Sequence, residues 1–105
     1  MDLAEWKAKT MTELIHLTKK YKDSAFQLKE LIHHVWRARV HSLYALIYKF
    51  YNLSDEIPEL KNLIPSPKEI NEIVKNCKKR KHYTDRKPLE KAKKEVETAL
   101  NLTIK

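Results

Sequence analysis

Residues 24–52, SAFQLKELIHHVWRARVHSLYALIYKFYN, decide the fold class of this 105-residue chain. The stretch contains no glycine and no proline, and large apolar side chains recur every three or four residues, which is the period of an α-helix. The predicted apolar face consists of Ala25, Leu28, Ile32, Trp36, Leu43, Leu46, Ile47 and Phe50. This spacing predicts one long helix from Ser24 to Asn52 with a broad face in the core.

Other helices are predicted on both sides of this stretch. Asp2 is a suitable N-cap for a first helix that extends to about Lys22. Ser54, with Asp55 and Glu56, is predicted to start a short third helix, in which Pro58 either lies in the first turn or marks the start. The sequence therefore continues as helix beyond the long central segment in both directions.

The clearest helix start is Ser66-Pro67-Lys68-Glu69, which combines a serine N-cap, a proline at the first helical position and a glutamate three residues on. A last helix is predicted to open at Asp85 or at Lys87-Pro88. Its apolar stripe consists of Leu89, Ala92, Val96, Ala99 and Leu100. We therefore predict an all-α fold, an antiparallel bundle of about five helices in a single domain of residues 1–105: two long, one short and two medium.

The composition excludes several classes of function. Glycine is absent, which excludes dinucleotide-binding fingerprints and P-loops. The single cysteine, Cys77, excludes a disulfide framework within the chain and a cysteine-clustered zinc site, and it is expected to pack inertly on the apolar side of its helix. No signal-peptide or membrane-spanning segment is visible, so we expect a cytoplasmic protein with no membrane partner, no cofactor and no metal.

Positive charge is concentrated in one stretch, from Lys75 to Lys94. This basic segment holds ten Lys or Arg against the two acids Asp85 and Glu90, a difference of +8 that equals the formal net charge of the full chain. A block of this kind creates a local field that attracts a polyanion, most often a nucleic-acid backbone. Single-stranded RNA or DNA is the favoured partner, together with protein partners or self-association.

The candidate phosphate-binding residues lie at the end of the fourth helix and on the fifth. They are Lys78, Lys79, Arg80, Lys81, His82, Arg86, Lys87, Lys91 and Lys94. Cations at a helix C-terminus also suit the helix dipole, so part of this run is open to interpretation as capping, or as a solvated face.

A second candidate surface follows the long predicted helix. Cationic and aromatic residues share one arc of it, and these are His34, Arg37, His41, Tyr44, Tyr48 and Tyr51. Such a row is able to follow a single strand, with rings stacked on bases and Arg37 paired to a phosphate. The alternative is that the tyrosines pack against a neighbouring helix or subunit; we expect Tyr44 and Tyr48 to be accessible in the isolated chain.

Arg39 falls inside the predicted apolar arc of the same helix. A buried guanidinium without a partner is too costly to persist. Arg39 is therefore expected to pair with a carboxylate such as Glu13 or Glu69, to extend to an edge, or to meet a phosphate or a second subunit.

The order of helix lengths resembles the HEPN superfamily of small helical domains associated with nucleotides and RNA. Two further stretches carry the same resemblance. One is the basic turn Arg80-Lys81-His82-Tyr83-Thr84-Asp85, and the other is the end of the last helix after it, Val96-Glu97-Thr98-Ala99-Leu100. HEPN ribonucleases place more residues between their Arg and His than the three between Arg37 and His41 or the one between Arg80 and His82. The resemblance therefore implies a non-catalytic binder.

The chain is also similar, in size, helicity and charge alone, to the small helical subunits of CRISPR effector complexes and to helix-bundle domains of archaeal plasmid primases. The predicted function is a non-enzymatic domain that binds a nucleic-acid backbone inside a larger complex. One alternative is a HEPN-type ribonuclease or toxin acting through Arg80 and His82 or through Arg37 and His41. Another is an adaptor that binds an acidic protein.

Overall fold

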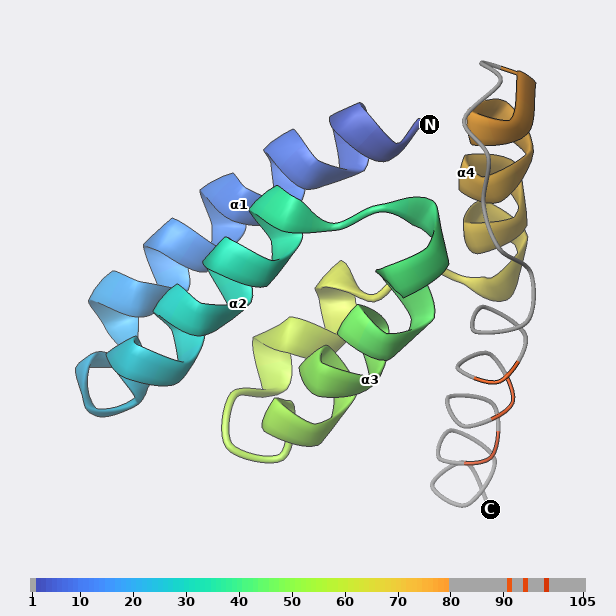
Figure 1. Cartoon of the computed structure of the whole chain (residues 1–105). Coiled ribbons are helices and arrows are strands. Elements are labelled where there is room, and N and C mark those ends of the chain that lie inside the picture. The colour runs from blue at the N-terminus through green and yellow to red at the C-terminus, as the bar shows by residue number, and fades with distance from the viewer. Residues whose placement is uncertain (1, 80–90, 92–93, 95–97, 99–105) are drawn as a thin grey trace.

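The computed structural model describes residues 2–79 together with Lys91, Lys94 and Thr98. The elements, in chain order, are α1 (Leu3–Lys20), the 3₁₀ turn η1 (Lys22–Ser24), α2 (Ala25–Arg37), the 3₁₀ turn η2 (Val40–Ser42), α3 (Leu43–Leu53), the 3₁₀ helix η3 (Pro58–Leu63) and α4 (Pro67–Lys79) (Figure 1). The described part of the chain contains no strand. The predicted all-α fold is confirmed, while the stripe of the predicted last helix lies outside the described residues.

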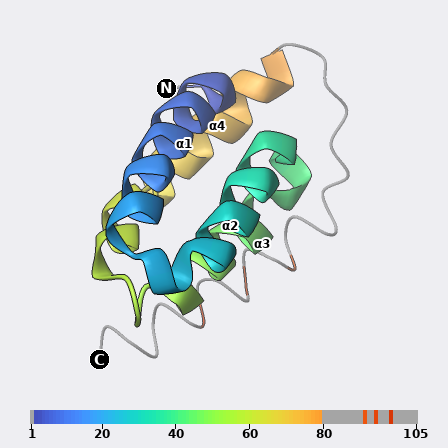
Figure 2. The ribbon, with the colours of Figure 1, turned by 90° about the vertical axis from the view of Figure 1, so that its left-hand side faces the viewer.

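Helix α1 begins where the sequence predicts. The Asp2 carboxylate accepts a 2.9 Å hydrogen bond from the backbone N–H of Glu5 and so caps the first turn. Four side chains spaced by three or four residues are buried along its length: Trp6, Thr10, Leu14 and Leu17. The three-residue turn η1 then returns the chain, and α2 packs along α1 as a helical hairpin (Figures 1 and 2).

The prediction of one continuous helix over residues 24–52 was wrong. The helix stops at Arg37, and both Ala38 (φ −60°, ψ 134°) and Arg39 (φ −117°, ψ 166°) have extended backbone. The backbone N–H of Arg39 donates to Ser42 Oγ at 3.1 Å, and the Ser42 hydroxyl donates to the Arg39 carbonyl at 3.0 Å. These local hydrogen bonds satisfy backbone groups that a continuous helix would otherwise pair, because a serine side chain competes with the helical ladder.

The core lies between the α1–α2 hairpin, α3 and η3. Its centre includes Leu14, Leu28, Val35, Leu43, Ile47, Phe50, Ile57 and Leu60. The Trp6 ring packs edge-on against Phe50 with centroids 6.2 Å apart, and its Nε1 donates to the Leu63 carbonyl at 3.4 Å. Trp6 therefore ties α1 to both α3 and η3.

The predicted helix start at Ser54 was wrong, because Ser54 caps the end of α3; the second of the two predicted options, a start at Pro58, is the one observed. Pro58 opens η3, where Leu60 is buried beside Ile57. On the opposite side, Glu59 accepts hydrogen bonds from the Tyr21 hydroxyl at 2.7 Å and from Lys20 Nζ at 3.1 Å. This cluster joins the end of α1 to η3.

The predicted capping box at the start of α4 is confirmed. The backbone N–H of Glu69 donates to Ser66 Oγ at 3.2 Å, and the backbone N–H of Ser66 donates to Glu69 Oε1 at 3.4 Å. Ile70 and Ile73 are buried, and α4 contacts α1 and η2. Helix α4 therefore starts at a fixed point on the helical body. The side chain of Cys77 lies outside the described residues.

Candidate nucleic-acid interface

The basic segment starts on α4. Lys75 is exposed, two residues after the buried Ile73, and the helix continues through Lys78 and Lys79. The side chains of Lys78 and Lys79 lie outside the described residues, as do Arg80, Lys81, His82, Arg86 and Lys87. The structure thus places the beginning of the basic segment at the end of a well-anchored helix.

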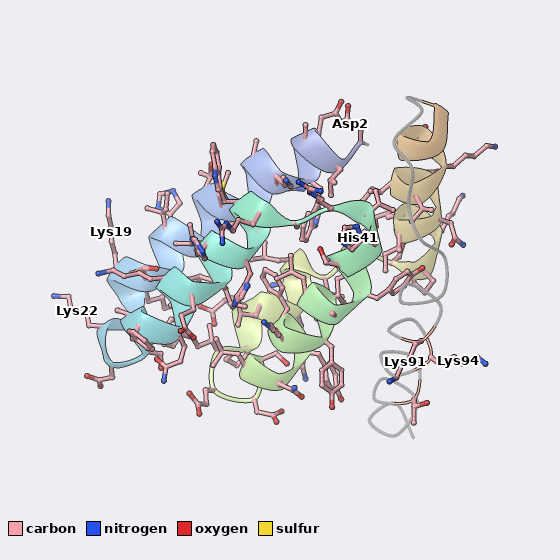
Figure 3. All side chains as sticks on the ribbon, in the orientation of Figure 1. Asp2, Lys19, Lys22, His41, Lys91 and Lys94 are labelled. Carbon is pink, nitrogen blue, oxygen red and sulfur yellow. The ribbon has the colours of Figure 1, made fainter. Side chains whose placement is uncertain are left out.

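Lys91 and Lys94 are the described residues further along the basic segment. Both are helical and both side chains are exposed (Figure 3). Residues three positions apart on a helix lie on the same side of it. The two ammonium groups are therefore able to contact one anionic backbone.

The predicted row of cationic and aromatic residues from His34 to Tyr51 is not continuous, because the break at Ala38 and Arg39 separates its two halves. Arg37 is exposed at the end of α2, and His41 is exposed on η2 at the side nearest α4 (Figure 3). Tyr44, predicted to be accessible, is buried with 5% of its surface exposed, so that prediction was wrong. Tyr48 remains accessible, with 37% exposed.

The reason for the Tyr44 error is the width of the buried arc of α3. Its buried positions are Leu43, Tyr44, Leu46, Ile47 and Phe50, which form a wider arc than the predicted apolar face. Tyr44 lies at one edge of that arc and joins the core. The exposed side of α3 carries Ala45, Tyr48, Lys49 and Asn52.

Arg39 also differs from its prediction. Its side chain is exposed, and it forms no ion pair with Glu13 or Glu69. The extended backbone at Ala38 and Arg39 changes the helical phase, so Ala38 is buried and Arg39 points to solvent. The placement of Arg39 inside an apolar arc of one continuous helix was therefore wrong.

A contact between α2 and α3 involves His34. Lys49 Nζ lies 3.2 Å from His34 Nε2. Because an ammonium group only donates, this contact requires a neutral imidazole that accepts at Nε2 and carries its proton on Nδ1. Partial desolvation, and then the positive charges of Lys49 and His33, lowers the pKa of His34 from its ordinary value of 6.5.

Two aromatic residues that the sequence did not place on a surface are exposed on α2. Phe26 is 71% exposed, and Trp36, predicted in the core, is 68% exposed. The buried residues of α2 are Leu28, Leu31 and Val35, followed by Ala38. These positions step by three, four and three, and that pattern in the sequence leaves Phe26 and Trp36 outside the buried face.

Residues 2–79 and the three described residues after them contain neither a metal-binding cluster nor a membrane-spanning helix. Within this part of the chain no three His, Cys, Asp or Glu side chains gather closely enough to hold a metal ion. Over the same residues, no helix has both the length and the apolar character needed to cross a membrane.

Comparison of the chain with protein-family models, with curated proteins and with solved structures finds no match.

Proposed function

We propose that the protein is a non-enzymatic helical domain that binds the phosphate backbone of a nucleic acid, as a module of a larger nucleoprotein complex. The observation that supports this function is the confinement of the net charge of +8 to residues 75–94. The described lysines of this segment, Lys75, Lys91 and Lys94, are all exposed. Exposed cations in one block neutralise phosphates and release counterions, which gives affinity without sequence preference.

The anchoring of α4 supports the same function. The capping box at Ser66 and Glu69 fixes where the helix starts, and the buried Ile70 and Ile73 hold it on the body. The basic segment therefore begins at a defined position, so its first cations need little ordering when they bind a polyanion.

A salt titration of binding tests this function. The purified chain is mixed with single-stranded RNA, single-stranded DNA and duplex DNA, and affinity is measured by fluorescence anisotropy at several salt concentrations. We expect log K to fall linearly with log salt, by about 0.7 to 0.9 per phosphate neutralised. The triple variant Lys78→Ala, Lys79→Ala, Lys81→Ala should bind all sequences more weakly and show a flatter slope.

A matched control removes the same amount of charge elsewhere. Lys9, Lys19 and Lys61 are exposed and lie outside the basic segment, so the triple alanine variant at these positions should retain the slope of the wild type. Equal losses in the two triple variants, or affinity that does not depend on salt, would contradict the proposal. RNA that is cut during the titration would instead support the HEPN-type ribonuclease, and binding only to an acidic protein would support the adaptor.

A further inference from the structure

The outer face of α2 has an unusual composition for a surface. Phe26 and Trp36 are 71% and 68% exposed, and both are on one helix. Large aromatic side chains normally bury most of their area, and exposed apolar groups that gather on one face mark an interaction site. The described part of the chain leaves both rings in solvent.

The two rings belong to a regular row. Exposed residues step along α2 by three, four and three, from Phe26 through Lys29 and His33 to Trp36, with Arg37 beside the last. This row lies on a different side of α2 from the buried Leu28, Leu31 and Val35. Trp36 follows Phe26 by ten positions, which is about 15 Å along a helix axis.

The helix beneath this row packs against α1. Lys7 Nζ of α1 donates a 3.1 Å hydrogen bond to the Trp36 carbonyl. The backbone N–H of Ala38 closes the end of the helix with a 3.1 Å bond to the Val35 carbonyl. The end of α2 that carries Trp36 is therefore held in place before any ligand arrives.

The charge of the row favours an anionic partner. Lys29 and Arg37 are exposed between and beside the rings, and neither forms an ion pair with residues 2–79. His33 adds a hydrogen-bonding ring. The acid Glu30 is also exposed and lies at the edge of the row, on the side of the helix that carries Arg37. Aromatic rings interleaved with cations suit a single strand, because its bases stack on the rings and its phosphates pair with the cations.

We propose that the outer face of α2 is a stacking surface for single-stranded nucleic acid, with bases on Phe26 and Trp36 and phosphates on Lys29 and Arg37. This inference rests on the proposed function and names the form of the nucleic acid. Four base steps at the 3.4 Å spacing of stacked DNA cover roughly the distance between the rings, so a strand of roughly five nucleotides reaches both. A duplex keeps its bases paired and is not able to use this surface.

The test compares single strands with duplexes of the same length, with the full chain and with Phe26→Ala and Trp36→Ala. Each ring should contribute a factor of roughly 5 to 150 in single-strand affinity, with duplex affinity unchanged. Trp36→Phe keeps a ring and should retain most of the affinity. The control is Ile15→Ala on α1, which removes an apolar side chain that is 48% exposed.

Tryptophan fluorescence supplies a second measurement. The other tryptophan, Trp6, is buried, so quenching by a bound single strand should report on Trp36 and should disappear in Trp36→Phe. Circular dichroism melting of each variant should match the wild type, because the substituted rings lie in solvent.

The outcomes separate this inference from the proposed function. Unchanged single-strand affinity in Phe26→Ala and Trp36→Ala, with salt-dependent binding intact, would overturn the stacking surface and leave the basic segment in place. Ring-dependent binding that survives the Lys78, Lys79 and Lys81 substitutions would overturn the role of the basic segment and leave the stacking surface in place. Absence of binding at low salt would overturn both. A dimer in sedimentation velocity that dissociates in Trp36→Ala, with nucleic-acid affinity unchanged, would reassign the face to contacts between copies of this chain.

Discussion

The Tyr21 hydroxyl donates a 2.7 Å hydrogen bond to Glu59, and this bond connects the end of α1 to η3 across 38 positions of sequence. The same carboxylate accepts from Lys20 Nζ. The bond from Tyr21 is the largest effect and lowers the pKa of Glu59 from its ordinary value of 4.5. Desolvation opposes it, and the bond from Lys20 lowers the pKa further.

The first prediction concerns acid stability. Because the pKa of Glu59 is lower in the folded protein, its ionised form stabilises the fold above pH 4.5, and this stabilisation is lost as the pH falls through the lowered pKa. The melting temperature of Glu59→Gln should therefore change less between pH 5 and pH 3 than that of the wild type. Glu72→Gln, which replaces an exposed glutamate of α4, is the control. Parallel curves for wild type and Glu59→Gln would contradict the assigned role of the cluster.

A second prediction concerns His34 and Lys49. The pKa of His34 is lowered in the folded protein, so the neutral imidazole stabilises the fold at pH values above 6.5, and this contribution is lost as the pH falls below 6.5 toward the lowered pKa. His34→Gln should remove the part of the pH dependence that falls in this window, measured by thermal melting from pH 8 to pH 5. His16→Gln on the exposed side of α1 should keep it.

Tyr44 and Tyr48 form a third test, because the structure assigns them different environments. Replacing the buried Tyr44 with Ala should lower the free energy of unfolding by about 3–5 kcal/mol, as for other large aromatic residues in cores. Tyr48→Ala, on the exposed side of α3, should cost on the order of 0.5 kcal/mol. Urea denaturation measures both, and equal costs would show that the phase of α3 is wrong.

The fourth prediction concerns the capping box. Ser66→Ala removes the acceptor for the Glu69 backbone N–H and should lower the free energy of unfolding by about 1 kcal/mol. Ser66→Asp restores an acceptor at the same place and should recover most of the loss. If Ser66→Ala unfolds at the same urea concentration as the wild type, the cap does not contribute to stability.

The features that could be predicted from the sequence are those set by neighbouring residues. The Asp2 cap and the Ser66–Glu69 capping box each depend on residues within one helical turn. Their hydrogen bonds form wherever the helix begins, so tertiary packing does not change them.

Two wrong predictions, the continuous helix and the position of Arg39, depend on the break between α2 and α3. Neither glycine nor proline marks it, and its hydrogen bonds come from Ser42, three residues after Arg39. A continuous helix assigns every side chain a direction by adding 100° per residue, so two extended residues alter every direction beyond them. This is why Arg39 appeared on the wrong side. Tyr44 was placed wrongly for another reason, because the buried arc of α3 is wider than the predicted apolar face. The Trp36 error arose before the break, from an apolar face drawn through Ile32 rather than Leu31 and Val35.

The three-residue turn η1 has a consequence for the order of folding. Helices α1 and α2 are adjacent in sequence and pack along each other, so their contacts close a short loop and lose little chain entropy. The Tyr21–Glu59 bond and the contact of α1 with α4 close much longer loops. We therefore expect the hairpin to form the folding nucleus. During synthesis from the N-terminus, the face that carries Phe26 and Trp36 then exists before the ribosome has added the cations of the basic segment.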